Sequence, residues 1–463
     1  MSIDEPILIP ITTIQPTFTN VIKEVYDGLI PSENIWVSQY HGTESTHARI
    51  RVSLDEEDRQ KVVFEPNNAE SKKLALGSSQ SSYTVNNTTL LIPTQTYTHA
   101  EPPSRITALA VSDDRSQFAI GLLDGSGYLY PITPQSTSTP EKYLHPHTPT
   151  TQPQSLVDPS IPGNRKAHKS TINALTFFPS SRVLLSAGAD FAIRVFPAEP
   201  PSPTPNPNTP NTTTTNTTTT AAHPARTLTA HTRPITSIAI NPHDRGRTVL
   251  SASLDGSVRV WNVASGTEVT EKRVRHGGSG VVDMVLSNTE TEKGKVYTAI
   301  QDGSFEVYTV DLVGEAGSRR VFKSTRSSAG PMSAIAVAVG EGVMAVGYAS
   351  GLVSLYTIEG ELETALEKPV VTFRRNTAAI EALSFLGGVE GAEVKLGIAT
   401  ADGLPWIAGI TLGKEEEKEV EVRAYAELTG GEIDAVRDIV ALGSPAEVWT
   451  VCDDGVVRRY VIP

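Results

Sequence analysis

The feature that most constrains this chain is an internal repeat. Residues 167–196 read AHKSTINALTFFPSSRVLLSAGADFAIRVF, and residues 230–262 read AHTRPITSIAINPHDRGRTVLSASLDGSVRVWN. Both begin with Ala-His, run through an alternating segment to a proline, and continue through Ser-Ala and a turn aspartate to an aromatic residue. Weaker copies bring the aligned turns to seven, at Asp124, Asp190, Asp255, Asp302, Ser350, Asp402 and Asp454. Repeats of this kind predict small structural units that stack on one another.

Each repeat is predicted to be an antiparallel sheet. Asp255-Gly256 favours a tight hairpin, because glycine readily adopts a positive φ. The alternation in residues 257–261 places every second side chain against a neighbouring sheet. No such sheet buries both of its faces alone, so stability must come from stacking around a closed ring. The pattern resembles the WD repeat, with Ala-His for the usual Gly-His and Trp261-Asn262 for Trp-Asp. We therefore predict an all-β fold, a seven-bladed WD-repeat β-propeller with a small N-terminal α/β appendage.

The best repeat contains the four residues of the hydrogen-bonded tetrad that is typical of WD repeats: His231, Ser251, Asp255 and Trp261. The preceding repeat has His168, Ser186, Asp190 and Phe196 at these positions, so its network lacks the indole donor. A His–Ser–Asp set also suggests a catalytic triad. However, the set recurs with the repeat, which is expected of a scaffold and not of an active site. We predict a structural tetrad and no catalytic residue.

The propeller is expected to span residues 85–463 and to close with a strand from the front of the chain. The chain ends just after the third strand of the last repeat, so a fourth strand must come from elsewhere. Residues 88–97, TTLLIPTQTY, precede the first repeat and are predicted to pair with the final blade, which removes an open sheet edge. Residues 198–226 are rich in Pro, Thr and Asn and predict a disordered loop between the last two strands of the second blade.

Residues 1–84 do not show the repeat. Residues 17–29 suit a short amphipathic helix, and residues 36–40, 48–54 and 61–64 read as strands. This segment is predicted to be a small α/β domain packed on the propeller. A role in binding and a role in merely covering one side of the ring are both open.

Composition narrows the class of partner. The formal charge of −13 opposes binding to nucleic acid, which requires Lys and Arg to neutralise phosphates. A basic protein surface is the better expectation, although acidity also aids solubility without any partner. No run approaches the roughly 18–20 apolar residues that span a bilayer, so no membrane association is expected. The single cysteine, Cys452, excludes an internal disulfide and suits a reducing compartment, and its place in a predicted strand indicates a buried thiol.

Other signatures of chemistry are weak. The histidines are scattered, with no His-Glu-x-x-His motif, and residues 277–280 (GGSG) precede a strand and do not open a helix, unlike a phosphate-binding loop. We therefore expect no cofactor and no metal, and a protein that is not an enzyme.

Three stretches carry a closer resemblance. Residues 449–463 read WTVCDDGVVRRYVIP, residues 172–199 read INALTFFPSSRVLLSAGADFAIRVFPAE, and residues 246–266 read GRTVLSASLDGSVRVWNVASG. They resemble the proteasomal ATPase-associated factor 1 family, the first two stretches more specifically than the third. The Thr-rich loop and the Ala-His pairs depart from that family's pattern.

The resemblance implies a chaperone for assembly of the proteasome regulatory particle, which binds the C-terminal domains of ATPase subunits of its base. It implies a protein of the cytoplasm and nucleus that is a monomer on its own. The contact is expected on the face that carries the loops between blades and the turns between second and third strands. The candidate partner-binding residues there are Glu432, Asp434, Asp453, Gln301 and Arg233.

Two other functions compete with this one. A substrate receptor or scaffold of a ubiquitin ligase complex would commonly carry Trp-Asp-x-Arg, whereas Trp261 is followed by Asn262-Val263-Ala264. A propeller hydrolase would need acidic or histidine residues that converge on the central channel, and none is recognisable in the sequence.

Overall fold

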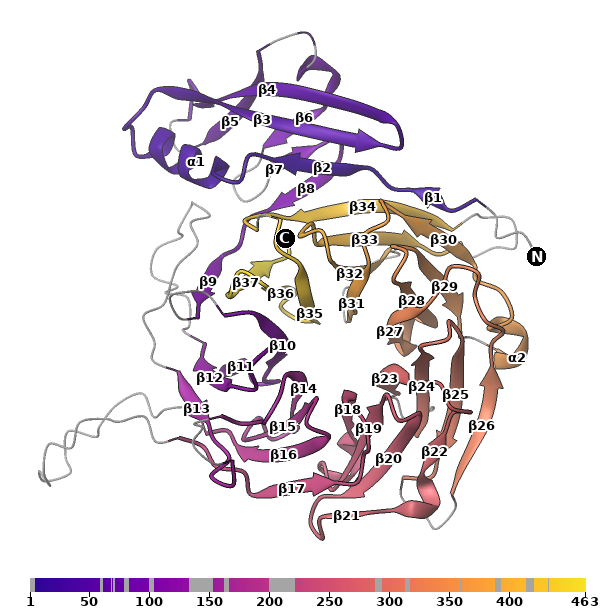
Figure 1. Ribbon diagram of the computed structural model, residues 1–463. Helices are drawn as coiled ribbons and strands as arrows, with labels where there is room; N and C mark the ends of the chain where they lie inside the picture. The colour runs from indigo at the N-terminus through magenta and orange to yellow at the C-terminus, as the bar shows by residue number, and fades with distance from the viewer. Residues whose placement is uncertain are drawn as a thin grey trace, which may run out of the picture. The chain divides into compact units, whose positions relative to one another are not determined.

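The computed structural model describes residues 5–58, 61–67, 69, 71–78, 83–99, 104–132, 153–161, 166–199, 221–287, 294–312, 317–358, 360–387, 393–413, 420–431 and 433–463. Among them, residues 5–99 and 324–463 form one compact unit, called the first unit here, and residues 104–132 and 153–323 form the second. Both units consist mainly of small antiparallel sheets (Figure 1). No helix in these ranges is long and apolar enough to cross a membrane.

The second unit holds four blades, each an antiparallel sheet of sequential strands. Blade 1 is β10 (Ile106–Val111), β11 (Gln117–Leu122), β12 (Gly127–Pro131) and β13 (Gln154–Leu156). Blade 2 is β14 (Ile172–Phe177), β15 (Val183–Gly188), β16 (Ala192–Pro197) and β17 (Arg226–Thr229). Blade 3 is β18 (Ile235–Ile240), β19 (Thr248–Ser253), β20 (Ser257–Asn262), β21 (Thr267–Glu268) and β22 (Val274–Arg275), with the 3₁₀ helices η2 (Pro242–Asp244) and η3 (Thr270–Lys272). Blade 4 is β23 (Val281–Leu286), β24 (Lys295–Ile300), β25 (Phe305–Val310) and β26 (Ser318–Lys323).

The first unit holds three more blades. Blade 5 is β27 (Met332–Ala338), β28 (Val343–Tyr348), β29 (Val353–Thr357) and β30 (Val371–Arg374), with η4 (Val339–Glu341) and the short helix α2 (Leu362–Ala365). Blade 6 is β31 (Ile380–Leu386), β32 (Glu393–Thr400), β33 (Trp406–Thr411) and β34 (Glu421–Leu428). Blade 7 is β35 (Val436–Leu442), β36 (Glu447–Cys452), β37 (Val456–Val461) and, from the front of the chain, β9 (Gln95–Thr98). The described residues therefore confirm the predicted class, an all-β fold of the seven-bladed propeller type.

The hydrophobic core lies between blades. Phe196 and Leu184 of blade 2 share a cluster with Leu129 of blade 1, and Trp261 of blade 3 packs with Ile193 of blade 2. Burial of such apolar surface contributes about 25 cal/mol per Å², so each blade depends on its neighbours for most of its stability. Small residues permit this packing. A Cβ at Gly121 would lie 2.5 Å from Ile172 Cγ2 of the next blade.

The segment expected to close the last blade contains two strands with different partners. β9 pairs antiparallel with β37, with Tyr97 opposite Val457, and supplies the fourth strand of blade 7. The first half does not join that blade, which corrects the expectation of one closing strand over 88–97. It forms β8 (Thr88–Leu91), which runs parallel to β34 at the edge of blade 6. Pro93 lies between the two strands, where its missing N–H breaks no ladder hydrogen bond.

The N-terminal part is a sheet covered by one helix, as expected. Strands β2 (Ile11–Ile14), β3 (Ser32–His41), β4 (Glu44–Leu54) and β5 (Val62–Pro66) follow one another in the sheet, and α1 (Phe18–Tyr26) packs on it through Phe18, Val21, Ile22 and Val25. The predicted helix, residues 17–29, is longer than α1. It ends earlier because Gly28 has a φ of +71°, outside the helical region.

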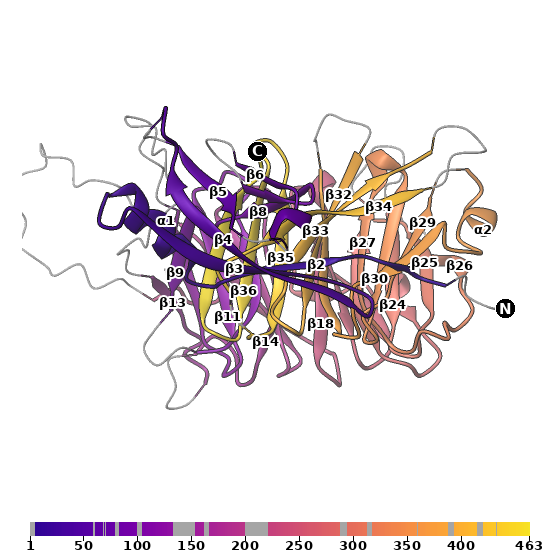
Figure 2. The same ribbon diagram turned by 90° about the horizontal axis from the view of Figure 1, so that it is seen from above.

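The N-terminal part is also joined to the blades by strand pairing. β1 (Ile7–Leu8) runs parallel to β30 of blade 5, and the η1 turn (Ser71–Lys73) leads into β6 (Leu76–Ser78) and β7 (Tyr83–Val85). These two strands extend the sheet of blade 6 through β8. In Figures 1 and 2 the segment from β1 to β2 follows β30 and β34. The boundary expected between residues 84 and 85 therefore falls inside β7.

Two long insertions lie between the third and fourth strands of blades 1 and 2. Of the loop expected over 198–226, residues 200–220 lie outside the described residues. Its ends join β16 to β17, and the Ala222 amide donates to the Ser155 carbonyl of blade 1 at 2.9 Å. The other insertion separates β12 from β13. Asp158, a buried residue discussed below, follows β13 on the connection to blade 2.

The turn between the second and third strands of blade 2 has a non-glycine residue in the left-handed backbone region, which disfavours side chains. Glycine follows the turn residue at Gly125, Gly256, Gly303, Gly351, Gly403 and Gly455, all with positive φ, whereas blade 2 has Phe191 with a φ of +66°. A side chain in this region costs about 1–2 kcal/mol, and the Phe191 ring is 39% exposed and so gains little from packing.

We therefore expect Phe191→Gly to raise the free energy of unfolding by about 0.5–1 kcal/mol, since the extra chain entropy of glycine offsets part of the relief. Denaturant titration measures this. The matched control, Gly256→Ala, should lower stability, because its Cβ would lie 2.9 Å from the Ser279 carbonyl oxygen. A loss of stability in Phe191→Gly would contradict the explanation.

Candidate interaction surface

The turns between second and third strands share one local device. In six of the seven blades in the described residues, the turn aspartate accepts a hydrogen bond from the amide two residues later. The bonds are Asp124–Ser126 (2.9 Å), Asp190–Ala192 (3.3 Å), Asp255–Ser257 (3.0 Å), Asp302–Ser304 (3.1 Å), Asp402–Leu404 (3.2 Å) and Asp454–Val456 (2.9 Å). Aspartate favours such turns because its short side chain reaches its own backbone. These carboxylates are thus occupied in shaping the turns.

In blade 3 the four tetrad residues form one connected network beneath the turn. His231 bonds Asp255 Oδ2 through Nδ1 at 2.8 Å and Ser251 Oγ through Nε2 at 2.7 Å. Trp261 Nε1 donates to the same Ser251 Oγ at 2.9 Å. Burial alone would raise the pKa of Asp255, but hydrogen bonds, that from His231 first, hold this pKa well below its usual range. All four side chains are buried or nearly so, and the network links the turn to the strands as a structural element.

Blade 2 keeps two of these three contacts and lacks the third. His168 bonds Asp190 and Ser186, both at 2.8 Å, and Phe196 stands where the indole would be. Arg194 pairs with Asp190 Oδ2 at 2.9 Å and with Asp158 at 2.7 Å. Burial is the main reason that the pKa of His168 lies below its usual value. Asp158, which the sequence did not single out, thus ties the segment that follows β13 to blade 2.

Blade 4 contains a related network that sequence reasoning missed. His276 Nδ1 lies 3.0 Å from Glu306 Oε2, Tyr308 donates to the same carboxylate, and Lys323 Nζ lies 2.9 Å from Oε1. Burial would raise the pKa of Glu306, but the hydrogen bonds from His276, Tyr308 and Lys323 outweigh it and lower the pKa to about 2. The acid comes from the third strand and not from the turn, so the repeat pattern gave no signal for it.

In the second unit, the two predicted contact residues lie on adjoining blades. Arg233 is exposed and donates to the Leu254 carbonyl at 3.2 Å. Gln301 is exposed beside the turn of blade 4, and its amide donates to the Gly280 carbonyl at 2.9 Å. A Cβ at Gly280 would lie 2.9 Å from Leu254 Cδ2, so the two loops are in contact. Both side chains are available to a partner.

In the first unit, the acidic residues differ in availability. Asp434 is exposed, whereas Glu432 lies outside the described residues. Asp453 is paired with Arg437, with Nη2–Oδ2 at 2.7 Å, and Arg437 also contacts Glu381 of blade 6 at 3.2 Å. The charge of Asp453 is therefore neutralised by Arg437, so a partner would meet an ion pair and not a free carboxylate.

Ile433 is an exposed apolar residue that the sequence did not single out. Its side chain is 87% exposed, next to Asp434 on the connection from β34 to β35. It follows Gly430-Gly431 in a loop, where no hydrophobic periodicity marks it as core or surface. Single exposed apolar residues are common on protein surfaces, and this one is accessible to a protein partner.

Little in the described residues suggests chemistry. Cys452 is buried, and burial raises the pKa of its thiol to about 12, which disfavours the nucleophilic thiolate. No group of three His, Cys, Asp or Glu side chains in the described ranges is placed to hold a metal ion.

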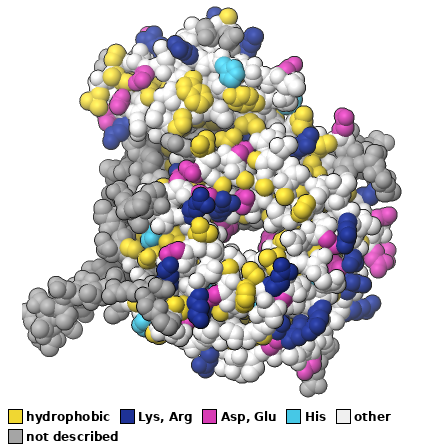
Figure 3. All heavy atoms as spheres, viewed as in Figure 1, with side chains coloured by type: hydrophobic (Ala, Val, Ile, Leu, Met, Phe, Trp, Pro, Cys, Tyr) yellow, Lys and Arg dark blue, Asp and Glu magenta, His cyan; other side chains and the backbone are white. Residues whose placement is uncertain are grey.

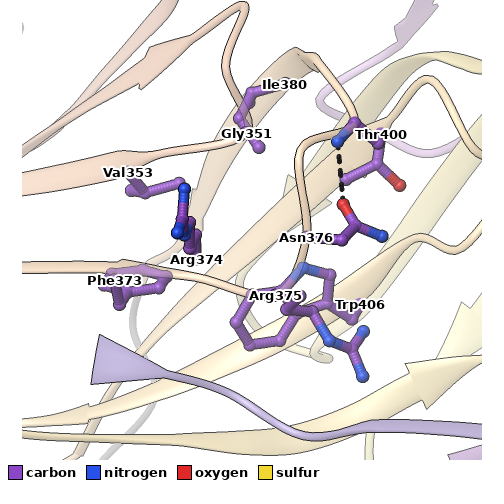
Figure 4. A pocket seen from close by; sticks show the side chains of 10 residues that line it. Gly351, Val353, Phe373, Arg374, Arg375, Asn376, Ile380, Thr400 and Trp406 are labelled. Carbon is purple, nitrogen blue, oxygen red and sulfur yellow. Dashed lines mark hydrogen bonds between the residues drawn. The ribbon is translucent and has the colours of Figure 1, made fainter. Parts of the chain in front are cut away.

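A small hollow opens between blades 5 and 6 (Figure 4). Its wall includes Trp406, with the Arg375 guanidinium 4.6 Å from the ring centroid. Asn376 donates to Asp402 at 2.6 Å and accepts from the Ala378 amide at 2.9 Å. Asn376 takes the role that His231 has in blade 3. Arg375 and Asn376 are thus engaged by neighbouring groups, which indicates packing between blades.

Comparison with known protein families agrees with the blade geometry. The model of the WD domain, G-beta repeat, matches residues 162–196 and 222–262. The second match begins before β17, the outer strand of blade 2, and ends with β20 of blade 3. One sequence repeat thus contains the outer strand of one blade and the inner strands of the next. β9 shows the same offset, because it is the outer strand of blade 7 but precedes blade 1 in the sequence. No curated protein matches the chain.

WD40 repeats are typical of non-enzymatic scaffolds for protein interactions. Together, the two matched repeats and the seven blades identify the chain as a WD-repeat protein with an all-β propeller fold.

Proposed function

We propose that this chain is an assembly chaperone that binds the C-terminal domains of ATPase subunits of the proteasome regulatory particle base. The observation that carries the proposal is the resemblance of residues 449–463 and 172–199 to the proteasomal ATPase-associated factor 1 family. The mechanism is occupancy of a surface, which delays docking of the bound subunit until competing contacts release it. The chain itself binds no nucleotide in this proposal.

The surface around Ile433 supports a basic, amphipathic partner. Ile433 offers an apolar contact, Asp434 beside it is exposed, and the protein carries a net charge of −13. Complementary charge speeds encounter and fixes orientation, while the apolar residue contributes affinity through burial. Arg233 and Gln301 of the second unit are separate candidate contact residues.

Co-purification from cell extract, with identification of the bound proteins, tests the proposal. We expect ATPase subunits of the proteasome base with the native chain, and at least about tenfold less with Ile433→Ser/Asp434→Lys. The matched control is Val370→Ser/Glu367→Lys, which changes an exposed apolar and an exposed acidic residue of blade 5. It should retain binding.

If no proteasomal ATPase co-purifies, the proposal fails. Recovery of ubiquitin-ligase adaptors in their place would favour the alternative, a substrate receptor or scaffold of a ubiquitin ligase complex.

A further inference from the structure

The N-terminal sheet has one covered face and one open face. On β3 and β4 the residues that alternate toward α1 are buried, among them Ile35, Val37 and Ile50. The intervening positions form the opposite face, where Trp36, Tyr40, His47, Arg49 and Arg51 are exposed. We call this set the open sheet face. Figure 3 shows hydrophobic side chains and a histidine gathered over this part of the chain.

Trp36 distinguishes this face from the rest of the protein. Of the four tryptophans, Trp261, Trp406 and Trp449 are at most 2% exposed, whereas Trp36 is 44% exposed. Tryptophan is enriched in the buried centres of protein interfaces, because its burial releases a large apolar area. A nearby pair, Tyr40 and His47, is packed edge to face at 5.4 Å, and His47 bonds Ser38 at 2.8 Å. Tyr40 and His47 are thus held in place without a partner.

The charge of the open sheet face is opposite to that of the protein as a whole. Arg49 lies directly across from Trp36, and Arg51 lies across from Asn34. Both arginines are exposed, and neither forms an ion pair or hydrogen bond with the described part of the chain. In a protein of net charge −13, two unpaired guanidinium groups on one strand mark a local site for carboxylates.

The spacing of Arg49 and Arg51 along β4 favours an extended ligand. Alternate residues of a strand lie about 6.8 Å apart, which is also the spacing of alternate side chains in an extended peptide. A peptide laid along β4 could therefore place one carboxylate on Arg49 and the carboxylate of its next-but-one residue on Arg51, with the aliphatic part of the first of these side chains against Trp36. Single-stranded nucleic acid also stacks on aromatic residues, but it needs a longer positive groove along its backbone than two arginines provide. Glu65 lies opposite Arg51 and disfavours either anionic ligand, so it does not distinguish them. The observations favour the peptide.

We propose that the open sheet face binds an extended acidic peptide segment of a partner protein, with Arg49 and Arg51 receiving alternate carboxylates and Trp36 packing beside them. This site is separate from the surface around Ile433 and does not depend on the function proposed above.

Binding of synthetic peptides to the full chain, followed by fluorescence polarisation, tests the proposal. The probe is a labelled peptide in which Glu alternates with Thr, and its matched control has Gln at every Glu position. We expect the Glu peptide to bind more weakly as salt increases. Arg49→Gln/Arg51→Gln and Trp36→Thr should each weaken binding about tenfold, which corresponds to about 1.4 kcal/mol.

Two further variants separate the site from general charge and from folding. Lys23→Gln/Lys72→Gln removes the same charge from exposed positions outside the open sheet face and should leave binding unchanged. Arg49→Lys/Arg51→Lys keeps the charge and should retain most of the binding, and the thermal melt of each variant reports whether the fold is intact.

Several results would overturn the proposal. They are equal binding of the Gln peptide, an equal loss with the Lys23/Lys72 control, and no binding of the Glu peptide by the full chain. Binding of oligouridylate through Trp36, Arg49 and Arg51 without binding of the peptide would assign the face to nucleic acid and also overturn it.

Discussion

Replacing Glu427 by alanine is expected to lower the free energy of unfolding by about 3–5 kcal/mol, because it leaves the charge of Arg375 buried and unpaired. Arg375 Nη1 lies 2.9 Å from Glu427 Oε2, and the side chains of both residues are about 5% exposed. The same carboxylate accepts from the Thr12 amide at 2.9 Å, while Arg375 Nη2 donates to the Pro10 carbonyl at 2.8 Å. The substitution thus removes the anchor of the N-terminal segment together with the ion pair.

Chemical denaturation measures the loss, and hydrogen exchange should show faster exchange at residues 7–14. The matched control is Glu393→Ala, which breaks a pair with Arg423 at 2.7 Å whose arginine is 41% exposed. Solvent replaces such a partner, so we expect a loss below about 1 kcal/mol. Equal losses in the two variants would show that burial of the Arg375–Glu427 pair does not determine its contribution.

Replacing Trp261 by alanine is expected to cost about 3–5 kcal/mol, because it opens a cavity between blades 2 and 3 and removes a donor. The indole is 2% exposed and packs in a cluster that includes Ile193, Leu228 and Val249. Trp261→Phe should cost about 1–2 kcal/mol, since it keeps most of the packing and removes only the hydrogen bond to Ser251. Blade 2 already contains this arrangement, with Phe196 at the same place.

Denaturant titration of the two variants separates packing from hydrogen bonding. Trp36→Ala serves as the control, since it removes the same side chain from an exposed position and should cost less than about 1 kcal/mol. If Trp261→Phe cost as much as Trp261→Ala, the hydrogen bond and not the packing would dominate.

Only part of the candidate site could be predicted from the sequence. The tetrad residues are visible in the sequence because they recur at fixed places around each turn. Glu306 was missed because it pairs with His276 from the third strand, while the turn acid Asp302 bonds within its own turn. Asp158 was missed because it reaches blade 2 from the segment that follows β13. Arg437 neutralises Asp453 across the turn, so a residue that the sequence presents as a free acid is paired in the fold. Such partners meet through contacts between segments that have no fixed spacing along the chain.

The sequence by itself determined the all-β class, the number of blades and the turn chemistry, because each of these depends on alternation and on residues a few positions apart. Only the tertiary structure decided which strands of residues 5–99 join blades 5, 6 and 7. Strand pairing depends on backbone groups that every residue carries, so the parallel partners of β1 and β8 leave no mark in the side chains. The tertiary structure also decided that Trp36 is exposed and Trp261 is buried, because burial depends on what packs on each sheet face and not on residue type.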